Sequence, residues 1–436
     1  MAPALYAGAI HRNRTEHVET LASSVGKDVR DDQYAPIVED FVAADVSKAL
    51  YHYRDIGKIP AVFLLKQVVW YSRSPGYGYD GYYRATHGTD SRRLDIMNQK
   101  VRVLAGDIGG TKTRLALFDV MGDVMGDDTG TTLQTVAEET YPSRDYQAFA
   151  EIAQLFLESH QCRCESACFG VAGPVRNGVA ETTNLPWRLV AGDLGDELEI
   201  TQVALLNDLE ANAWGIQVLD TDDFCVLQDG DRHPAGNAAV IAAGTGLGEA
   251  GMYRDGRRYR PFGTEGGHTD FSPANELEFE LLRFLRRQYA HVSWERVLSG
   301  PGLVNIHTFL RAYRSSEVPG WLVESMLTGD PAAAISQAAL LERDEICVEA
   351  LDLFVHFYGV EAGNLALKMM ATGGVYLGGG IAPKIIEKLQ GELFMQGFRS
   401  KGRMQHLLES MPVLVILNDR TALYGAAVFG ALSVND

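Results

Sequence analysis

The chain has 436 residues, of which 46% are hydrophobic and 22% are charged, and this predicts a globular protein of two or three domains. The net charge of -18 argues against nucleic acid or an anionic membrane surface as the main partner and favours a small molecule. No segment reaches the roughly 18 apolar residues of a membrane helix, and the start lacks the layout of a secretory signal. We therefore expect a soluble, cytoplasmic protein.

Cysteine is sparse, and an odd count of five suits a reducing cytosol. Three of the five, Cys162, Cys164 and Cys168, are spaced superficially like metal ligands. No second set of Cys or His residues lies nearby at ligand spacing, so the sequence favours scattered thiols over a zinc site.

Residues 1–96 differ from the remainder. They carry no recognisable chemistry, and the stretch from Ser72 to Gly88 has the composition of a loop or a disordered segment. Two amphipathic pieces, Ile37 to Tyr53 and Ile59 to Tyr71, have helical character. Because Met97 lies just before the first strand-like run, we interpret residues 1–96 as an unassigned, flexible extension or as an over-extended start.

A glycine-rich stretch, GDIGGTKTR, lies between the apolar runs Val101 to Ala105 and Leu115 to Phe118. The runs predict two short strands and the glycines predict a tight turn, so we expect a β-hairpin with a bare loop. Such a loop exposes backbone N–H groups and the carboxylate of Asp107, which suits a polyphosphate. An ordinary hairpin turn is an equally good interpretation of this stretch alone. It is not a Walker A loop, because Lys112 follows Thr111.

Strands and helices alternate through the rest of the chain, which predicts an α/β sheet. The range 142–160 has apolar residues at helical spacing. Ala167 to Val171 and Val203 to Leu206 are predicted as buried strands, and the second runs directly into Asn207 and Asp208. Ligands bind beyond the carboxyl ends of strands in such sheets, so this pair is a candidate site.

Two further glycine loops follow predicted strands. Gly244 to Gly248 comes after the strand Ala238 to Ala243, and its position as a second strand-to-strand loop suggests an internal duplication. Gly378 to Gly380 joins the strand Val375 to Leu377 to a helix that opens near Ala382, which directs a helix N-terminus toward the loop. Each loop alone is also typical of a generic turn. Three such loops in one chain favour a shared function.

Three more side chains are typical of a site that binds vicinal hydroxyls. Glu265 and His268 lie among glycines, which present side chains rather than bury them, and Glu295 precedes the tight connector Ser299 to Gly302. Carboxylates and imidazoles are groups that hydrogen-bond to hydroxyls. Taken singly, a surface ion pair for Glu295 and a satisfied turn histidine for His268 are the favoured interpretations.

Together these segments resemble the bacterial ATP-dependent glucokinase family, which belongs with the sugar kinases, actin and the heat-shock ATPases. The resemblance covers Val101 to the C-terminus in one order and rests on GDIGGTKTRLALFDV, FGVAGPV, TTNLPW, LLNDLEANAWG, AAGTGLG, GTEGGHTDF, ERVLSGPGLVNIH and GGVYLGGGIAPK. It implies a two-lobed α/β fold, actin-like and ribonuclease H-like, with a duplicated βββαβα core and a central cleft. The zinc-binding cluster of the related repressor branch is absent after Glu265, which implies the zinc-free branch.

The resemblance also implies residue roles. Asp208 matches the catalytic base, which accepts the proton of the sugar 6-hydroxyl during attack on the γ-phosphoryl group of ATP. The matching sugar-binding positions are Asn207, Asp208, Glu265, His268 and Glu295. Asp107 matches a position near Mg²⁺, expected to act through water. The matching ATP-binding positions are Gly106, Asp107, Ile108, Gly109, Gly110, Thr111, Lys112, Gly244, Thr245, Gly246, Gly248, Gly378, Gly379 and Gly380. Lys112 stands where other members often carry Asn, and a solvated lysine is slightly favoured there.

Kinases of this family close two lobes over the cleft and expel water. The implied small domain comprises residues 97–219 plus 419–436, with a helix near Thr421 to Leu432, and the large domain comprises 220–418. Two helices of the large domain are predicted directly: 275–289, with a core stripe of leucines, and 346–370, ended by Gly373 and Gly374.

We therefore expect a kinase that uses ATP and Mg²⁺ to convert glucose to glucose 6-phosphate, at the entry to glycolysis. A kinase of another hexose, such as mannose or fructose, is the first alternative, because hydroxyl-reading pockets separate epimers weakly. A non-catalytic sugar sensor is the second, and Asp208 and the three glycine loops argue against it. The expected partners are glucose and ATP, without nucleic acid or membrane, and dimerisation is common in the family, which leaves a homodimer open.

Overall fold

The computed structural model describes residues 100–122, 131–182, 185–231, 236–256 and 258–434. The interpretation of residues 1–96, with its two helical pieces, lies outside the described residues. All of the described residues belong to the compact unit Asp90–Asp436. None of the helices in this described part is long and apolar enough to cross a membrane.

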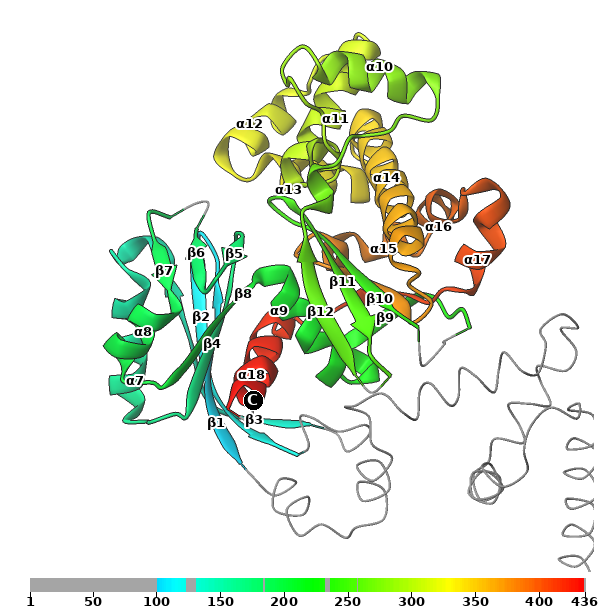
Figure 1. Cartoon of the computed structure of the whole chain (residues 1–436). Helices are drawn as coiled ribbons and strands as arrows, with labels where there is room; N and C mark the ends of the chain where they lie inside the picture. Colours follow the sequence, from blue (N-terminus) through cyan, green and yellow to red (C-terminus); the bar gives the residue numbers. More distant parts are fainter. Residues whose placement is uncertain (1–99, 123–130, 183–184, 232–235, 257, 435–436) are drawn as a thin grey trace, which may run out of the picture. The chain divides into compact units, whose positions relative to one another are not determined.

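The first half of the described chain forms a five-stranded sheet in the order β3-β2-β1-β4-β8 (Figure 1). Strands β3, β2 and β1 are antiparallel neighbours, whereas β1, β4 and β8 run parallel. The strands are β1 (Val101–Ile108), β2 (Lys112–Met121), β3 (Thr132–Pro142), β4 (Ser166–Val171) and β8 (Gln202–Asn207). A small sheet contains β5 (Val175–Arg176), β6 (Val179–Glu181) and β7 (Arg188–Val190), and the helices of this half are α7 (Phe149–His160), α8 (Ala191–Leu198) and α9 (Asp208–Gly215).

The second half forms a six-stranded sheet in the order β12-β11-β10-β13-β14-β9. Its strands are β9 (Phe224–Gln228), β10 (Ala238–Ala243), β11 (Leu247–Arg254), β12 (Tyr259–Thr264), β13 (Gly374–Gly378) and β14 (Val413–Ile416). Its helices are α10 (Glu276–Leu285), α11 (Gly300–Tyr313), α12 (Gly320–Thr328), α13 (Pro331–Leu340), α14 (Glu345–Met369), α15 (Ile386–Leu389), α16 (Glu392–Arg399), α17 (Gln405–Ser410) and α18 (Thr421–Ser433).

The two sheets repeat one plan. Each begins with three antiparallel strands, β1-β2-β3 in one and β10-β11-β12 in the other, and continues with parallel strands on the far side of the first strand. A helix follows the last parallel strand of each plan, α9 after β8 and α18 after β14. This is the duplicated actin-like core that the sequence predicts.

Helices α9 and α18 pack against each other between the two sheets (Figure 1). α18 contacts β1, β2, β4 and β8 of the first sheet, and α9 contacts β10, β11 and β12 of the second. Glycines allow the close crossing, because a Cβ at Gly215 would overlap the backbone of Thr421, and a Cβ at Gly425 would overlap the backbone of Ala211. The helix that begins at Asp208 is therefore fixed between both sheets.

The long helix α14 lies at the centre of the largest core. Phe354, Phe357 and Tyr358 on this helix are at most 1% exposed, and they pack with side chains of α11, α13, α16 and the second sheet. Burial of these large aromatic side chains stabilises the region through the hydrophobic effect. The second sheet is thereby backed by a helical layer (Figure 1).

The chain crosses between the two sheets twice. It leaves the first sheet after α9 to enter β9, and it returns after β14 to form α18. The two crossings are tied together, because Leu417 N donates to Asp223 O (2.8 Å) and Asn418 Nδ2 donates to Asp223 Oδ1 (3.1 Å). That residues 97–219 plus 419–436 and residues 220–418 act as separate domains stays a prediction.

The helix predicted over 142–160 is wrong in its first part. Pro142 ends β3, Ser143–Asp145 form a 3-10 turn, and α7 begins only at Phe149. The apolar residues that carried the helical spacing all lie within α7, so the periodicity located the helix but not its start.

Two helices of the second half end differently from their predictions. α14 ends at Met369, and its C-cap is Met370 in the left-handed conformation (φ 49°) rather than Gly373 and Gly374. α10 ends at Leu285, and the residues up to Tyr289 form turns. The helix predicted near Thr421 to Leu432 is confirmed as α18.

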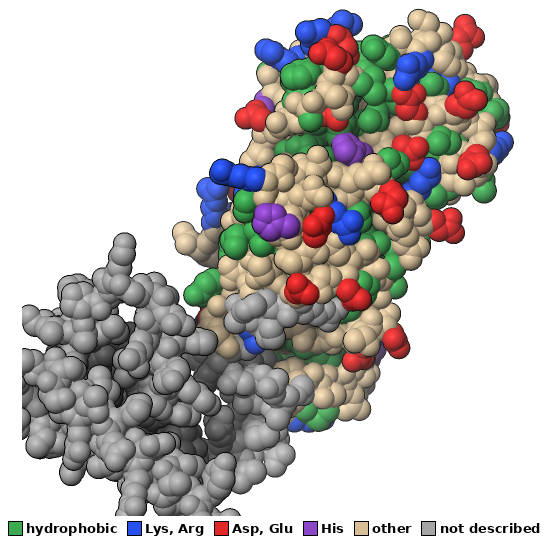
Figure 2. All heavy atoms as spheres, turned by 90° about the vertical axis from the view of Figure 1, so that its right-hand side faces the viewer, with side chains coloured by type: hydrophobic (Ala, Val, Ile, Leu, Met, Phe, Trp, Pro, Cys, Tyr) green, Lys and Arg blue, Asp and Glu red, His purple; other side chains and the backbone are tan. Residues whose placement is uncertain are grey.

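The face of the described chain drawn in Figure 2 carries acidic, basic and apolar side chains intermingled. Lysine and arginine side chains on this face are scattered among aspartate and glutamate side chains rather than gathered into a stripe.

Candidate active site

The carboxyl ends of the parallel strands of the first sheet form one row. Ile108, Val171 and Asn207 are paired across β1, β4 and β8. Asp107 stands one position earlier, beside Gly170. A Cβ at Gly170 would lie 3.0 Å from Ala211 Cβ and 3.9 Å from the Asp208 Cα, so the missing side chain lets α9 approach the row. Asp107 and Asp208 therefore lie on either side of Gly170.

The carboxylate of Asp208 is held at the start of α9. Its Oδ1 accepts a hydrogen bond from Leu209 N (2.9 Å). Burial, with the negative charge of Asp107 next, raises its pKa to about 6, although the hydrogen bonds from Leu209 and Asn207 act in the opposite direction. A carboxylate tuned toward neutral pH in this way can hold or release a proton under physiological conditions.

The carboxylate of Asp107 shares this environment. Burial raises its pKa above the ordinary value, Arg114 opposes the shift, and Asp419 adds to it. Arg114 is itself paired to Asp419, with an NH2 to Oδ2 distance of 3.0 Å. The edge of the sheet thus carries more carboxylate charge than its arginine compensates, which is typical of a cation site.

The first glycine loop has the predicted hairpin geometry. Gly109 N donates to Lys112 O (3.0 Å), which closes the turn between β1 and β2. Ser143 supports the loop from behind, since its Oγ donates to Gly109 O (2.8 Å) and its N donates to Thr111 O (3.0 Å). Sequence reasoning missed Ser143, because it lies 34 residues from Gly109 and shows no motif.

Three of the predicted ATP-binding positions of this stretch lie inside β1: Gly106, Asp107 and Ile108. A Cβ at Gly106 would come within 2.7 Å of Phe169 and 2.9 Å of Leu115, so this glycine serves core packing. The Ile108 side chain is 1% exposed. Thr111 and Lys112 are exposed at the loop. Gly106 and Ile108 therefore serve the sheet and its core, and neither presents a side chain to a ligand.

The second and third glycine loops meet at the end of β10. Ala243 O accepts a hydrogen bond from Ile381 N (3.3 Å), and a Cβ at Gly379 would overlap this carbonyl group. Gly379 also has a φ of 79°, which favours glycine. Gly244 O accepts from Gly300 N at the start of α11 (2.8 Å). Thr245 and Gly380 are exposed, whereas Gly378 is buried at the end of β13.

A fully buried tyrosine fixes these two loops. Tyr358 Oη donates to Ile241 O (3.2 Å) and to Gly378 O (3.3 Å), and it accepts from Ala243 N (3.3 Å). Its hydroxyl thus joins the ends of β10 and β13 from beneath. The sequence gives no signal for this role, since the residue belongs to the ordinary apolar stripe of α14.

Leu209 joins the first sheet to the second glycine loop. A Cβ at Gly248 would overlap the Leu209 side chain, so the two residues are in direct contact. Leu209 follows the candidate base Asp208 on α9. The glycine loop of the second sheet and the carboxylates of the first sheet are therefore held next to each other.

The predicted sugar-binding residues are not equally available. Asn207 caps α9, since its Oδ1 accepts from Leu209 N (3.0 Å) while its Nδ2 donates to Gly173 O (3.1 Å). Its Oδ1 lies 4.0 Å from where a Cβ would stand on Gly263 of β12, so it faces the second sheet. The side chains of Glu265 and His268 are 68% and 59% exposed, with Oε2 and Nε2 3.9 Å apart.

Glu295 is engaged by the second glycine loop. Its Oε2 accepts from Leu247 N (3.1 Å) and would lie 2.6 Å from a Cβ on Gly246. The structure therefore brings the carboxylate of Glu295 to the phosphate-type loop, where it also leaves Gly246 no room for a side chain. The side chain remains half-buried.

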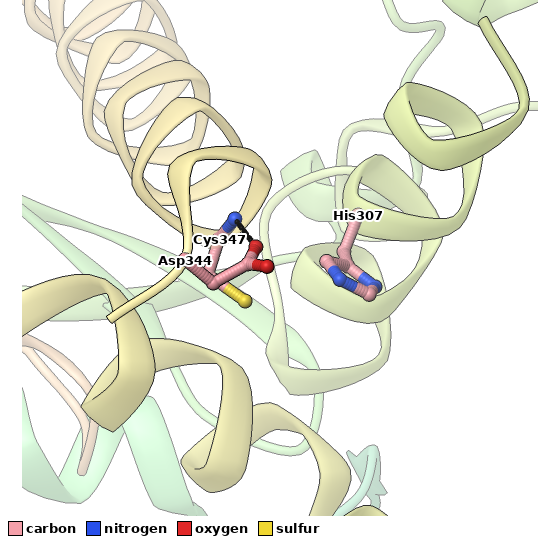
Figure 3. A group of neighbouring side chains, drawn as sticks. All are labelled: His307, Asp344 and Cys347. Atoms are coloured by element: carbon pink, nitrogen blue, oxygen red, sulfur yellow. Dashed lines mark hydrogen bonds between the residues drawn. The ribbon is translucent and has the colours of Figure 1, made fainter. Parts of the chain in front are cut away.

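A separate cluster contains His307, Asp344 and Cys347, whose ligand-type atoms lie within 4.8 Å of one another (Figure 3). Arg311 already occupies it: its Nε donates to His307 Nε2 (3.1 Å) and an NH2 group donates to Asp344 Oδ1 (2.6 Å). Asp344 Oδ1 also caps α14 by accepting from Cys347 N (2.8 Å). Burial and Arg311 lower the pKa of His307 to about 4. A guanidinium group in this position excludes a cation, so the cluster links α11 to α14.

The cysteines at 162, 164 and 168 are free thiols. Cys162 and Cys164 pack against the core between α7 and the first sheet, and Cys168 is buried in β4. All three are part of the packing of the first half.

A duplicated α/β fold with glycine loops at the strand ends, and with paired carboxylates beside them, defines the class of actin-like ATPases and sugar kinases. The glucokinase family model matches residues 104–432. The glucokinase of Nostoc sp. is 43% identical over 347 residues, which is 76% of this chain and 98% of that protein. The chain belongs to the glucokinase family.

Solved structures agree with this assignment. The crystal structure of glucokinase from an Antarctic psychrotroph matches with a TM-score of 0.66 and 30% identity, over 77% of this chain and 100% of that chain. A ROK family glucokinase from Streptomyces griseus, solved in complex with glucose and AMPPNP, matches with a TM-score of 0.51 and 20% identity, over 76% and 99% of the two chains. The second match shows a shared fold.

Proposed function

We propose that the chain transfers the γ-phosphoryl group of ATP to the 6-hydroxyl of glucose, giving glucose 6-phosphate and ADP. One observation carries the proposal: in a chain of the glucokinase family, the carboxylate of Asp208 stands at the end of β8 with a pKa of about 6, next to the glycine loop that follows β10. A group of this pKa and position suits a base for a sugar hydroxyl.

Asp208 acts on the attacking hydroxyl. Above pH 6 its carboxylate is ionised and can accept a hydrogen bond from the 6-hydroxyl, which orients the oxygen toward the phosphoryl group. The transition state of phosphoryl transfer is loose, so the proton moves to Asp208 late. The backbone N–H of Leu209 holds this carboxylate in place, and the side chain of Asn207 accepts from the same N–H.

The glycine loops are proposed to hold ATP. The turn at Gly109 to Thr111 and the loop at Gly244 to Gly248 offer backbone N–H groups to the phosphates, and the loop at Gly378 to Gly380 serves the adenosine side. Ser143 supports the first loop and Tyr358 supports the ends of the strands before the other two, which favours a preformed ATP site. A preformed site costs little conformational entropy on binding.

Mg²⁺ fits the edge beside Asp107. The excess carboxylate charge of Asp107 and Asp208 is opposed only in part by Arg114, and hard cations prefer such oxygen donors. When bound, Mg²⁺ would neutralise charge on the β- and γ-phosphates. The protein's part is to hold the Asp107 carboxylate at the end of β1, near the first glycine loop.

Glu265, His268, Glu295 and Asn207 are proposed to bind the sugar. The exposed side chains of Glu265 and His268 project from the 3-10 turn Gly266–His268, where hydroxyl groups of a ligand can reach them. The Asn207 side chain faces the second sheet beside Asp208, which places it next to the proposed position of the sugar 6-hydroxyl. The carboxylate of Glu295 would join the sugar site to the glycine loop that it already contacts.

A hexose panel tests the substrate. ADP release with ATP and Mg²⁺ is measured with glucose, mannose, fructose and galactose at equal concentrations. The proposal predicts the highest kcat/KM for glucose. A higher kcat/KM for another hexose would show that this hexose, and not glucose, is the preferred substrate. ATP binding without turnover of any hexose would support a sugar sensor instead.

A cytoplasmic setting and a role at the entry to glycolysis belong to the same proposal, as do a homodimeric assembly and closure of residues 97–219 plus 419–436 over residues 220–418. The free cysteines among the described residues suit a reducing compartment. The two linked crossings near Asp223 and Asn418 are suitable hinge positions, because only two short connections join the halves of the fold.

A further inference from the structure

A buried carboxylate lies directly beneath the turn that carries Glu265 and His268. Glu249 of β11 is 2% exposed, and a Cβ at Gly266 would overlap its Oε2. The next residue, Gly267, is equally close to β11, because a Cβ there would overlap the backbone of Leu247. The 3-10 turn Gly266–His268 therefore packs directly on β11 with no side chain between them. The Glu249 side chain lies immediately beneath the turn.

The turn is also tied to Glu249 through Thr264. Thr264 Oγ1 donates to Glu249 O (3.0 Å) and accepts from Gly266 N (3.3 Å). In contrast, Glu249 Oε1 is buried without a hydrogen-bond partner among the described residues. An ionised carboxylate with an unsatisfied buried oxygen is costly, so the site favours the neutral acid.

A second buried acid, Glu361 of α14, lies close enough to Glu249 to share a hydrogen bond with it when one of the two carries a proton. Glu361 is 0% exposed, and it is held by Asn364 Nδ2 (2.8 Å to Oε2) and by Lys368 Nζ (3.5 Å to Oε1). Lys401, which follows α16, adds a nearby positive charge and donates to Val360 O (2.9 Å). Burial raises the pKa of Glu361 as well, but Asn364, Lys368 and Lys401 oppose that shift, so Glu361 has more partners that stabilise a negative charge than Glu249 has.

Among the described residues, the two strands that flank Glu249 place no charged side chain opposite it. β10 places Ile241 opposite Glu249, and β12 places Thr264 there. The titratable side chains at the turn, Glu265 and His268, are largely exposed. The groups that set the charge beneath the turn are therefore Glu249 and Glu361, with Lys368 and Lys401.

We propose that the buried carboxyl pair of Glu249 and Glu361 positions the Gly266–His268 turn, and that glucose affinity depends on a proton kept on this pair. The inference rests on the proposed role of Glu265 and His268 in sugar binding. Glu249 is a positioning residue, since it acts on the sugar only through the turn above it.

The titration of the pair gives the direction of the effect. Burial and the charge of Glu361 raise the pKa of Glu249 to about 8, and burial lowers the pKa of Lys401 to about 8. As the pH rises above 8, Glu249 gains a negative charge while Lys401 loses its positive charge. Lys401 acts on Glu361, whereas the new charge on Glu249 lies directly beneath Gly266. That charge is relieved only if the turn moves and admits water.

Glucose binding to the full chain without ATP, measured by calorimetric titration from pH 6.5 to 9.5, tests the inference. We expect the dissociation constant to rise above pH 8 with a slope of at most about one proton, or roughly tenfold per pH unit. Glu249→Gln keeps the shape of the side chain but cannot ionise, so its dissociation constant should stay flat to pH 9.5. Glu361→Gln should move the rise to lower pH, because it removes the negative neighbour that keeps Glu249 protonated.

Glu278→Gln is the matched control. Glu278 is another buried carboxylate, 4% exposed, but it caps α10 through Ala274 N and does not contact the turn. Its alkaline rise should equal that of the native chain. A native dissociation constant that is flat with pH, or an alkaline rise that persists in Glu249→Gln, would overturn the inference. No glucose binding at pH 7 would instead contradict the proposed function.

Discussion

Replacing Asp208 with Asn should slow the reaction and stabilise the fold at the same time. The pKa of Asp208 is about 6 in the folded chain against a usual 3.8, so the folded state holds its proton more tightly than the unfolded state. Between pH 3.8 and 6 the free energy of unfolding therefore falls as the pH rises, and above pH 6 the full cost of the buried charge remains. About two pH units correspond to about 3 kcal/mol.

Asparagine at position 208 removes this charge and can still accept the hydrogen bond from Leu209 N. We expect Asp208→Asn to raise the free energy of unfolding by up to about 3 kcal/mol at pH 7.5 and to lower kcat roughly 10²- to 10⁴-fold. Denaturant unfolding at pH 7.5 and pH 4 measures the first effect, and ADP release measures the second. The gain in stability should shrink toward pH 4. The exposed Asp196→Asn serves as the control, with neither effect.

Two results would refute this reasoning. A lower free energy of unfolding for Asp208→Asn at pH 7.5 would show that the native charge is stabilised at this position rather than strained by burial. An unchanged kcat would remove Asp208 from its role as the base. Either result can occur without the other, so the electrostatic argument and the chemical argument are tested separately.

Three further predictions follow from the same geometry. For the native chain, kcat/KM for glucose should fall about tenfold per pH unit below pH 6 as Asp208 is protonated, and a profile flat to pH 5 would contradict the assignment. Glu265→Gln should raise the glucose dissociation constant roughly tenfold through the loss of a charge-assisted hydrogen bond, whereas an unchanged constant would place Glu265 outside the sugar site. Tyr358→Phe should cost about 1–3 kcal/mol of stability and raise KM for ATP, since the carbonyl groups of Ile241 and Gly378 lose their donor; a native melting temperature would contradict this.

The parts of the fold that depend on local patterns were predictable from the sequence. The strand that ends at Asn207 and the helix α18 appear within one residue of their predicted ranges. The hairpin around Gly109 is also present, but its strands run three residues further into the predicted loop, to Ile108 and from Lys112. Glycine, alternating apolar runs and helical periodicity are short-range signals, so they can be interpreted without knowledge of the tertiary structure.

Helix ends were less predictable, because caps depend on geometry rather than on residue type alone. Met370 ends α14 in a left-handed conformation although Gly373 and Gly374 stand three and four residues later. The chain must enter β13 directly afterwards, and Gly373 is already needed where Gly236 and Asn237 approach closely. Tertiary contacts therefore decide which residue serves as the cap.

The support beneath the candidate site could not be predicted at all. Ser143, Tyr358 and Glu249 each contact a glycine loop or turn from a distant part of the sequence, and none lies in a motif. Their roles follow from pairing between strands and from the packing of α14, which are long-range relations. The sequence located the exposed loops, and the structure adds the buried groups that hold them.

Identification of the reaction product tests the central claim most directly. The chain is incubated with glucose, ATP and Mg²⁺, and the products are followed by phosphorus and carbon NMR. The account predicts one equivalent of ADP for each glucose 6-phosphate formed, with the phosphate on the 6-oxygen, and loss of this product in Asp208→Asn. Phosphate on another oxygen, or ADP released together with free phosphate and unchanged glucose, would contradict it.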